Sequence, residues 1–175
     1  MLNDLVDVPL AIAQLSLHDS DLAVLEEIGR VSLGSHDRSS LRADLIMPFT
    51  FAWGARLGAA GEPVGFIVTW RVADELHVLD VASSPSFRRR GAGRALMLHA
   101  IGFAQTSHAR LVLLEVRRRN IPAVRLYRAL GFTVARVRRA YYDDGEDALE
   151  MNLMLDPNTG DIVPSVDEFP VDEEN

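Results

Sequence analysis

Glycines and arginines are concentrated in one short stretch that could bind an anion. Gly91 and Gly93 follow an apolar segment and precede a helical one, and Arg89, Arg90 and Arg94 lie beside them. A turn between a strand and a helix leaves backbone N–H groups unpaired at the positive end of the helix dipole. Glycine lets a ligand approach the backbone, and arginine balances its charge. The stretch therefore favours a diphosphate site over its alternative, a capping turn with solvated arginines.

Two further side chains could move protons. Glu115 interrupts the apolar segment 111–116, where an unpaired buried carboxylate would cost several kcal/mol. Either a salt bridge to a neighbouring arginine offsets this cost, or Glu115 is a general base whose pKa is raised by its apolar setting. Tyr127 lies among apolar residues of a predicted helix, so it is either a proton donor or a core residue.

The elements that would position these residues follow the order βααβββαβαββ. Strands are predicted at 10–17, 51–57, 64–72, 76–82, 111–116, 133–140 and 147–155. Helices are predicted at 22–31, 39–45, 94–106 and from the N-cap Asn120 to the C-cap Gly131. An antiparallel meander combined with two helical crossovers predicts an α/β fold, a central mixed sheet with helices on both faces.

Length and composition exclude several classes of protein. A chain of 175 residues fits one domain, predicted at 1–155, and zero cysteines exclude disulfide scaffolds and cysteine nucleophiles. No apolar run is long enough for a membrane helix, and no cationic leader precedes residue 10, so we expect a cytoplasmic protein without membrane contact.

Charge is distributed unevenly along the chain. The net charge of −7 arises in the segment 156–175, which we expect to be a flexible acidic tail, while the body is formally neutral. All 18 basic residues are arginines, and several of them are bunched. Taken alone, a single cluster is more simply explained as a solvated or ion-paired surface, and an anionic partner is the alternative. The neutral body, the sparse aromatic residues and the acidic tail argue against nucleic-acid binding.

Several motifs together resemble the GCN5-related N-acetyltransferase (GNAT) family. The hallmark Arg-x-x-Gly-x-Gly is present as Arg88-x-x-Gly91-x-Gly93, and the likeness extends from about residue 64 to 155. It is strongest to the bacterial ribosomal-protein-alanine N-acetyltransferases. The matching motifs are Pro85-x-Phe87-x-Arg89-Arg90-Gly91-x-Gly93-Arg94, Leu114-Glu115-Val116-Arg117, Asn120, Leu126-Tyr127, Leu130-Gly131-Phe132, Arg138-Arg139-x-Tyr141-Tyr142 and Glu146-Asp147-Ala148.

The resemblance implies a GNAT-like fold and transfer of acetyl from acetyl-CoA to an amine. It makes Glu115 the proton acceptor and Tyr127 the proton donor. Tyr141 and Tyr142 lie on the last predicted hairpin, where we expect them to line the acceptor entrance; the alternative is that they are surface aromatics of the strand. Residues implied to contact the cosubstrate, through the pantetheine arm or the pyrophosphate, are Val81, Ala82, Ser83, Arg89, Arg90, Gly91, Ala92, Gly93, Arg94 and Asn120.

The acceptor is the open part of this interpretation. A protein N-terminus, such as the terminal alanine of a ribosomal protein, is favoured because an α-amine of pKa ~7.8 is far easier to deprotonate than lysine at ~10.4. The segment 34–38 departs from the family pattern on the acceptor side. A small-molecule amine acceptor and a noncatalytic acyl-CoA-binding module are the alternatives. His18 and His36 lack neighbours at metal-ligand spacing, so no metal is expected.

Overall fold

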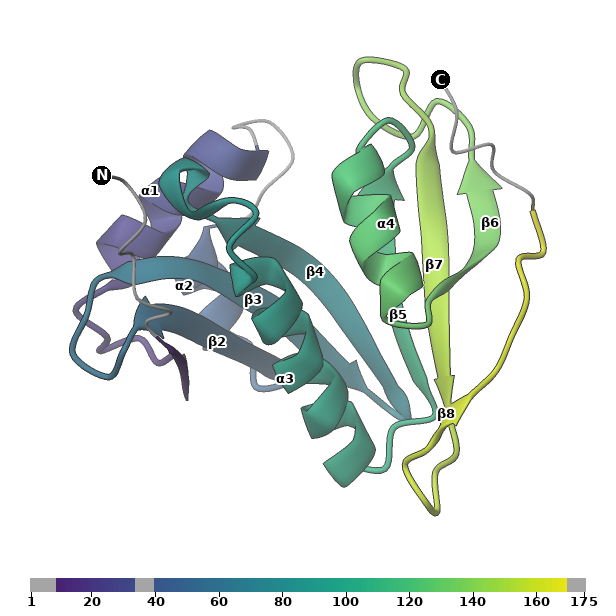
Figure 1. The fold of residues 1–175 in the computed structure, drawn as a ribbon, viewed down its shortest axis with the longest axis horizontal. Coiled ribbons are helices and arrows are strands. Elements are labelled where there is room, and N and C mark those ends of the chain that lie inside the picture. The colour runs from purple at the N-terminus through teal and green to yellow at the C-terminus, as the bar shows by residue number, and fades with distance from the viewer. Residues whose placement is uncertain (1–8, 34–39, 170–175) are drawn as a thin grey trace, which may run out of the picture. The chain divides into compact units, whose positions relative to one another are not determined.

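The computed structural model describes residues 9–33 and 40–169, so the segment 34–38 and His36 lie outside the described residues. Within that part, one eight-stranded sheet has the order β1-β2-β3-β4-β5-β7-β6, with β8 paired to β7 (Figure 1). The strands are β1 (Leu10–Gln14), β2 (Thr50–Leu57), β3 (Pro63–Val72), β4 (Glu75–Ser83), β5 (Leu111–Arg117), β6 (Thr133–Arg138), β7 (Ala148–Leu155) and β8 (Ile162–Val163). The helices are α1 (Leu22–Leu33), α2 (Leu41–Ile46), the 3-10 turn η1 (Pro85–Phe87), α3 (Ala92–Thr106) and α4 (Ile121–Ala129).

The predicted mixed α/β fold is confirmed. β4 and β5 pair in parallel, whereas β1–β2, β5–β7 and β6–β7 are antiparallel. Two short elements, η1 and β8, do not appear in the sequence prediction, because three-residue and two-residue elements carry no readable periodicity. The strands of the last hairpin are shorter than predicted, because β6 ends at Arg138 and a longer connection precedes β7.

The chain divides into two compact units, and the first comprises residues 1–69 and 80–100. Its core joins α1 and α2 to β2 and β3. The buried residues of this core are Leu15, Leu22, Leu25, Ile28, Leu41, Ala52, Phe66, Val68 and Ala82. In Figure 1, α3 lies in front of the strands of this unit. Because Ala82 belongs to this core, the core fixes the end of β4, which is one of the two elements predicted to bind the cosubstrate.

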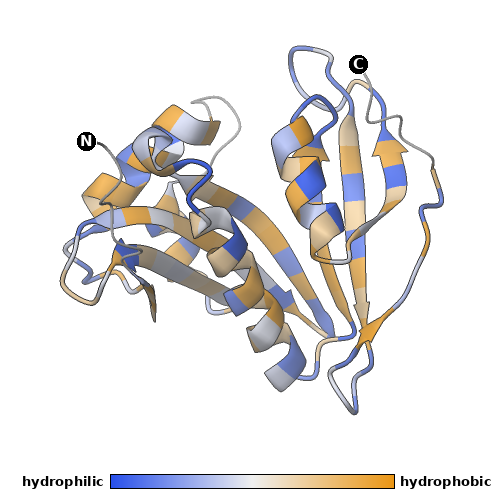
Figure 2. Ribbon diagram, in the orientation of Figure 1, coloured by the Kyte–Doolittle hydropathy of each residue, from blue (hydrophilic) through white to orange (hydrophobic). Residues whose placement is uncertain are grey.

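The second unit comprises residues 70–79 and 101–175. Along β5, the buried residues Val112, Leu114 and Val116 alternate with partly exposed ones, and Figure 2 shows the same alternation of apolar and polar bands along β7. In the register, Leu114 lies opposite Met151, and both are buried. Figure 1 shows α4 in front of β5 and β7, so we assign the buried face of these strands to α4. The other face carries Glu115.

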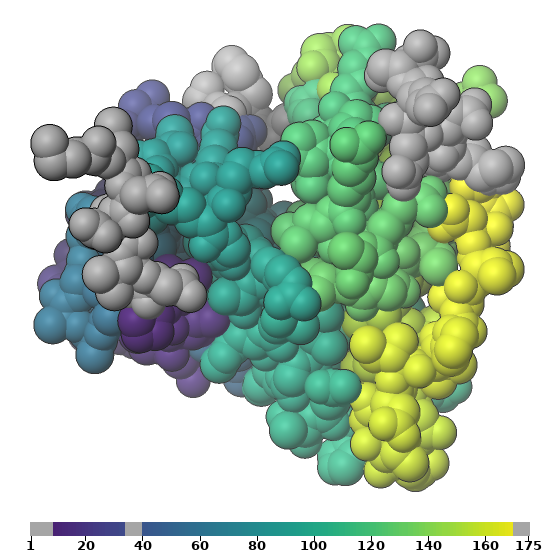
Figure 3. Space-filling model, viewed as in Figure 1, coloured from purple at the N-terminus to yellow at the C-terminus, as the bar shows by residue number. Residues whose placement is uncertain are grey.

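The acidic C-terminal segment makes specific contacts as far as residue 169. β8 pairs with the end of β7, and Asp167 accepts a hydrogen bond from the Val134 N–H at 2.7 Å while forming an ion pair with Arg128 at 2.8 Å. Gly160 accepts a hydrogen bond from Gln105 at 2.8 Å. Figure 3 shows this segment on the surface of the second unit. Its flexibility stays a prediction, and the last acids lie outside the described residues.

Candidate active site

The turn before α3 has an unusual backbone conformation. Arg89 has a φ of +63° and Gly91 a φ of +86°, and the left-handed region costs about 1 kcal/mol for a residue other than glycine. Strain of this kind is concentrated at functional sites. A Cβ added to Gly91 would meet nothing within 4 Å, so the space beside the backbone is open.

Backbone donors of this turn are available to a ligand. Among the described residues, none accepts a hydrogen bond from the N–H groups of Ala92, Gly93 or Arg94, and the first donor that pairs is Ala95, whose N–H reaches the Gly91 carbonyl at 2.9 Å. These three amides lie at the positive end of a 15-residue helix. They form the kind of cradle that binds phosphate oxygens.

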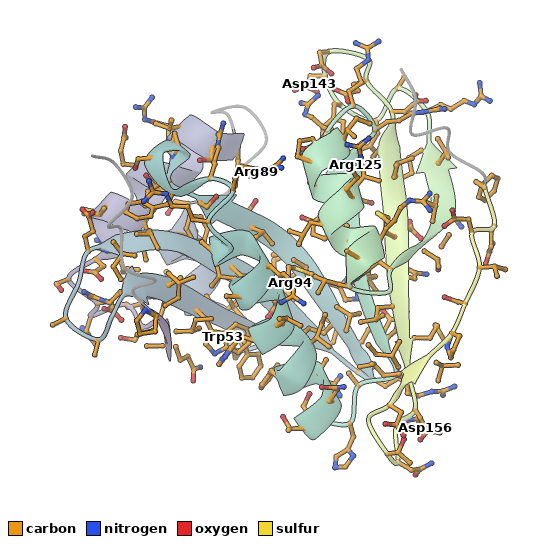
Figure 4. The ribbon with its side chains drawn as sticks, viewed as in Figure 1. Trp53, Arg89, Arg94, Arg125, Asp143 and Asp156 are labelled. Atoms are coloured by element: carbon orange, nitrogen blue, oxygen red, sulfur yellow. The ribbon has the colours of Figure 1, made fainter. Side chains whose placement is uncertain are left out.

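Arginine side chains surround these amides without being neutralised. Arg88, Arg89, Arg90 and Arg94 are exposed and form no ion pair with any residue in the described part of the chain. Figure 4 shows Arg89 on the turn and Arg94 at the start of α3. The guanidinium of Arg90 lies 5.2 Å from the centre of the Phe87 ring. Free amides, free positive charge and open space together fit the pyrophosphate of acetyl-CoA.

The end of β4 is held from two sides. The Ser32 hydroxyl donates to the Ser83 carbonyl at 2.8 Å, and the Ser84 N–H donates to the Val64 carbonyl at 2.8 Å. Gly65 is required here, because a Cβ at this residue would lie 2.5 Å from the Ala82 carbonyl oxygen. Val81, Ala82 and Ser83 are therefore fixed in position, and their contact with the pantetheine arm stays a prediction.

Asn120 is the N-cap of α4, as predicted. Its side-chain oxygen accepts from the Ala123 N–H at 3.4 Å, and Pro122 occupies the first turn. The amide NH₂ of Asn120 is a donor that the cap does not use. Capping leaves this group able to contact the cosubstrate, which is the second role predicted for Asn120.

Tyr127 is buried on α4, and 8% of its surface is exposed. Its ring lies 5.9 Å from that of Phe132. Burial, with a smaller effect from Tyr142, raises the pKa of Tyr127 to about 12. The phenol is therefore a weaker acid than an ordinary tyrosine, and its role as proton donor stays a prediction.

Glu115 is ion-paired. Its Oε1 lies 3.1 Å from Nε of Arg138, which also bonds Oε2 of Glu150 through Nη2 at 2.8 Å. This is the salt bridge that the sequence left open as one of two ways to offset the cost of the carboxylate. The Tyr141 phenol donates a hydrogen bond to Glu115, and this bond is the main reason that the pKa of Tyr141 is raised.

The loop between β6 and β7 carries the two predicted acceptor tyrosines. The rings of Tyr141 and Tyr142 meet edge to face at 5.3 Å, and the guanidinium of Arg117 lies 3.8 Å above the Tyr142 ring. Arg117 also bonds Asp144 at 2.8 Å and Glu146 at 3.1 Å. Both tyrosines donate their backbone N–H to the Glu146 carbonyl. This loop is thus fastened to the end of β5.

The structure brings some predicted residues together and separates others. Glu115 and Tyr141 are in contact with each other. Tyr127 and Tyr142 are close enough for the charge of Tyr142 to raise the pKa of Tyr127. Glu115 lies on the sheet face opposite to the one that α4 covers with Tyr127. The predicted pyrophosphate contacts belong to the first unit, whereas Asn120 and the proton-transfer and acceptor residues belong to the second.

Sequence reasoning assigned no role to Arg138, Glu150, Arg117 or Glu146, which hold the predicted residues in place. The alternation of Glu150 with the buried Leu149 and Met151 was a signal for its position on the Glu115 face. Across the described residues, no group of histidines and carboxylates could hold a metal ion. Nor does any described helix have the length and apolar character needed to cross a bilayer.

Comparisons with known proteins agree with this geometry. The profile of the acetyltransferase (GNAT) family matches residues 20–132. The [ribosomal protein bS18]-alanine N-acetyltransferase of Escherichia coli K12 is 40% identical over 98 residues, covering 54% of this chain and 66% of that enzyme, which is just under two thirds. A streptothricin acetyltransferase of Streptomyces lavendulae is 36% identical over 103 residues, covering 55% of this chain and 54% of that protein.

A solved structure extends the likeness to most of the chain. The crystal structure of the ribosomal-protein-S18-alanine N-acetyltransferase from Escherichia coli has a TM-score of 0.68 and 28% identity, and covers 91% of this chain and 99% of that one. GNAT acetyltransferases use acetyl-CoA, so the enzyme class and the cosubstrate predicted from the sequence are confirmed at the level of the family. The chain belongs to the acetyltransferase (GNAT) family.

Proposed function

We propose that this protein transfers acetyl from acetyl-CoA to the N-terminal α-amine of a protein, with the terminal alanine of a ribosomal protein as the preferred acceptor. The observation that supports it most is the cluster in which Glu115 of β5 contacts Arg138 of β6 and Tyr141 of the β6–β7 loop, all three of which belong to the predicted family motifs. The similarity to a ribosomal-protein-alanine N-acetyltransferase points the same way. A cytoplasmic location is part of this proposal.

The turn at residues 89–94 would hold the cosubstrate. The N–H groups of Ala92, Gly93 and Arg94 would donate to the pyrophosphate, and Arg89 and Arg90 would balance its charge. Val81–Ser83 would pair with the pantetheine arm, and the unused NH₂ of Asn120 would donate to it. The bound carrier would supply an activated acetyl group.

The acceptor amine must be neutral to attack. An α-amine with a pKa of ~7.8 is partly neutral at pH 7, whereas a lysine amine at ~10.4 requires about 3.5 kcal/mol more. Glu115 would take the proton through a water molecule, because a carboxylate paired with Arg138 is a weak base for direct transfer. Since the chain has no cysteine, the amine would attack the thioester directly.

Tyr127 would stabilise the departing thiolate by hydrogen bonding. Its pKa of about 12 exceeds that of a thiol, ~8.5, by roughly 3.5 units, so complete proton transfer would require about 5 kcal/mol. A hydrogen bond that strengthens as the thiolate develops avoids this penalty. The phenol thus shares its proton, and solvent completes the transfer.

A small-molecule amine is the second candidate acceptor. The similarity to a streptothricin acetyltransferase favours it, although the match covers 54% of that protein. Mass spectrometry separates the two. We expect an acetyl group on alanine-starting peptides, and none on the same peptides carrying a blocked N-terminus and an internal lysine. Faster acetylation of streptothricin than of any free-terminus peptide would contradict the proposal in favour of the second candidate.

A further inference from the structure

Two carboxylates face each other on neighbouring strands. Glu115 on β5 and Glu150 on β7 are direct partners in the antiparallel register, so their side chains leave the same face of the sheet. Like charges in this arrangement repel each other, and one of two close carboxylates tends to keep a proton. A cation between the two groups lowers the electrostatic cost of holding both carboxylates side by side.

Arg138 supplies that cation from a strand that is not adjacent to β5. Its Nε lies 3.1 Å from Glu115, and both Nε and Nη2 bond Glu150, at 3.1 and 2.8 Å. The side chain therefore reaches across β7. Ala148, the register partner of Arg138 on β7, is fully buried and small, which leaves room for the crossing.

A β-bulge aims Arg138 at this face. Val134 is opposite Met151 on the buried face, but the register shifts before Arg136, which is opposite Glu150. With regular pairing, Arg138 would lie opposite Asp147 and point to the buried face. The extra residue turns Arg138 toward the two glutamates instead, as bulges near active sites often do.

Apart from Arg136, the other charged groups described on this face are already partnered. On β5, Arg117 bonds Asp144 and Glu146. On β4, His77 is the register partner of Leu113 and bonds Glu75 at 2.8 Å. Tyr141 approaches from the β6–β7 loop, with its ring 5.4 Å from the Arg138 guanidinium. Arg136, also on β6, is exposed and forms no ion pair with the described residues.

We propose that Arg138 is the positioning residue of this site: it keeps Glu115 ionised and oriented toward the acceptor by separating it from Glu150. The proposal rests on the function proposed above, which gives Glu115 its role. Arg138 itself transfers no proton. Its effect would be to keep the carboxylate in its working state at pH values at which the α-amine is still largely protonated.

Four variants test the proposal through the pH profile of kcat with an alanine-starting peptide. Neutralising Arg138 in Arg138→Gln leaves Glu115 facing Glu150 without a cation, so the acidic limb should move up by about one pH unit. Adding Glu150→Gln to Arg138→Gln should move the acidic limb most of the way back to its wild-type position. Glu150→Gln alone should not move the limb upward. Arg136→Gln, on the same strand and face, is the matched control and should match wild type.

Rescue by the double variant separates this role from a merely structural one. If Arg138→Gln leaves the acidic limb in place, or if Glu150→Gln fails to move it back, the proposal is wrong. Should Arg138→Gln not fold, Arg138→Lys replaces it, because lysine retains the positive charge but lacks the forked guanidinium. For this variant we expect an acidic limb near its wild-type position and a kcat reduced about threefold. A limb shifted as far as one pH unit in Arg138→Lys would overturn the proposal.

A second readout is independent of activity. Carboxyl carbon NMR of selectively labelled glutamate should show Glu115 titrating at higher pH in Arg138→Gln than in wild type. If wild type acetylates no peptide but this difference is present, the proposed function fails and the role of Arg138 stands. If peptides are acetylated and the titration of Glu115 is the same in both proteins, the proposed function stands and the role of Arg138 fails.

Discussion

Two groups of arginines in this molecule look alike in the sequence but differ in whether acidic side chains pair with them. Those at 88–94 in the first unit are exposed, form no ion pairs among the described residues and lie beside three free backbone amides. Those at 117, 118 and 138 in the second unit are tied to Asp144, Glu146, Asp147, Glu115 and Glu150. A bunched set of arginines is thus evidence for an anion site only where the fold leaves its charge unpaired. In the second unit, arginines orient carboxylates and a tyrosine loop.

The strongest test of this contrast changes the backbone of the free turn. Gly91→Ala should weaken the binding of coenzyme A about a hundredfold, or about 2.7 kcal/mol, because it strains a φ of +86° and fills the space that the ligand approaches. Gly145→Ala is the control, since Gly145 has a φ of +81° and equally open surroundings in the second unit. Calorimetry giving equal affinities for both variants would place the ligand elsewhere.

Changes in the second unit should affect turnover instead of cosubstrate binding. Glu115→Gln and Tyr127→Phe should each lower kcat at least tenfold and leave the dissociation constant of acetyl-CoA within about twofold of wild type, because neither residue belongs to the phosphate turn. Steady-state kinetics and calorimetry on the same preparations measure both quantities. Wild-type turnover in both variants would remove the assigned roles.

The burial of Tyr127 predicts a pH dependence of stability. Its pKa is raised from 10 in the unfolded chain to about 12 in the folded one, so the folded state holds the proton more tightly. The resulting stabilisation is complete below pH 10 and is lost as the pH rises toward 12. At pH 11 the free energy of unfolding should have fallen by about 1.4 kcal/mol more in wild type than in Tyr127→Phe. Parallel denaturant curves for the two proteins across this range would show that the phenol is not buried in this way.

Single arginine substitutions should produce the smallest difference between the two groups. Arg94→Gln removes a charge that no acidic side chain among the described residues balances, so coenzyme A should bind about fivefold more weakly at low salt. Arg118→Gln, whose charge is paired with Asp147 at 3.4 Å, should bind like wild type. The difference between them should shrink at high salt. Equal losses in both variants would mean that ion pairing does not distinguish the two groups.

Local signals predicted the fold well, including the turn and the helices that would carry the first half of the candidate site. Glycine spacing located the turn before α3, and the cap pattern of Asn120 and Pro122 located α4. Both depend on neighbours in the sequence. The same is true of the apolar run 111–116, which located β5 and placed Glu115 near its end.

The second half of the site depends on pairings distant in the sequence. Arg138 meets Glu115 only because β7 lies between β5 and β6 and because a bulge shifts the register by one residue. The contacts of the C-terminal segment, such as Asp167 with Val134, likewise join residues more than 30 positions apart. Periodicity cannot reveal such isolated hydrogen bonds, and the flexibility that composition predicts for this segment stays a prediction.

Backbone amide NMR during a titration with coenzyme A reports on both arginine groups in one experiment. We expect the largest chemical-shift changes at the N–H groups of Ala92, Gly93 and Arg94, and little change at the amides of residues 117–119. Shifts confined to 117–119, or no binding at all, would contradict this expectation.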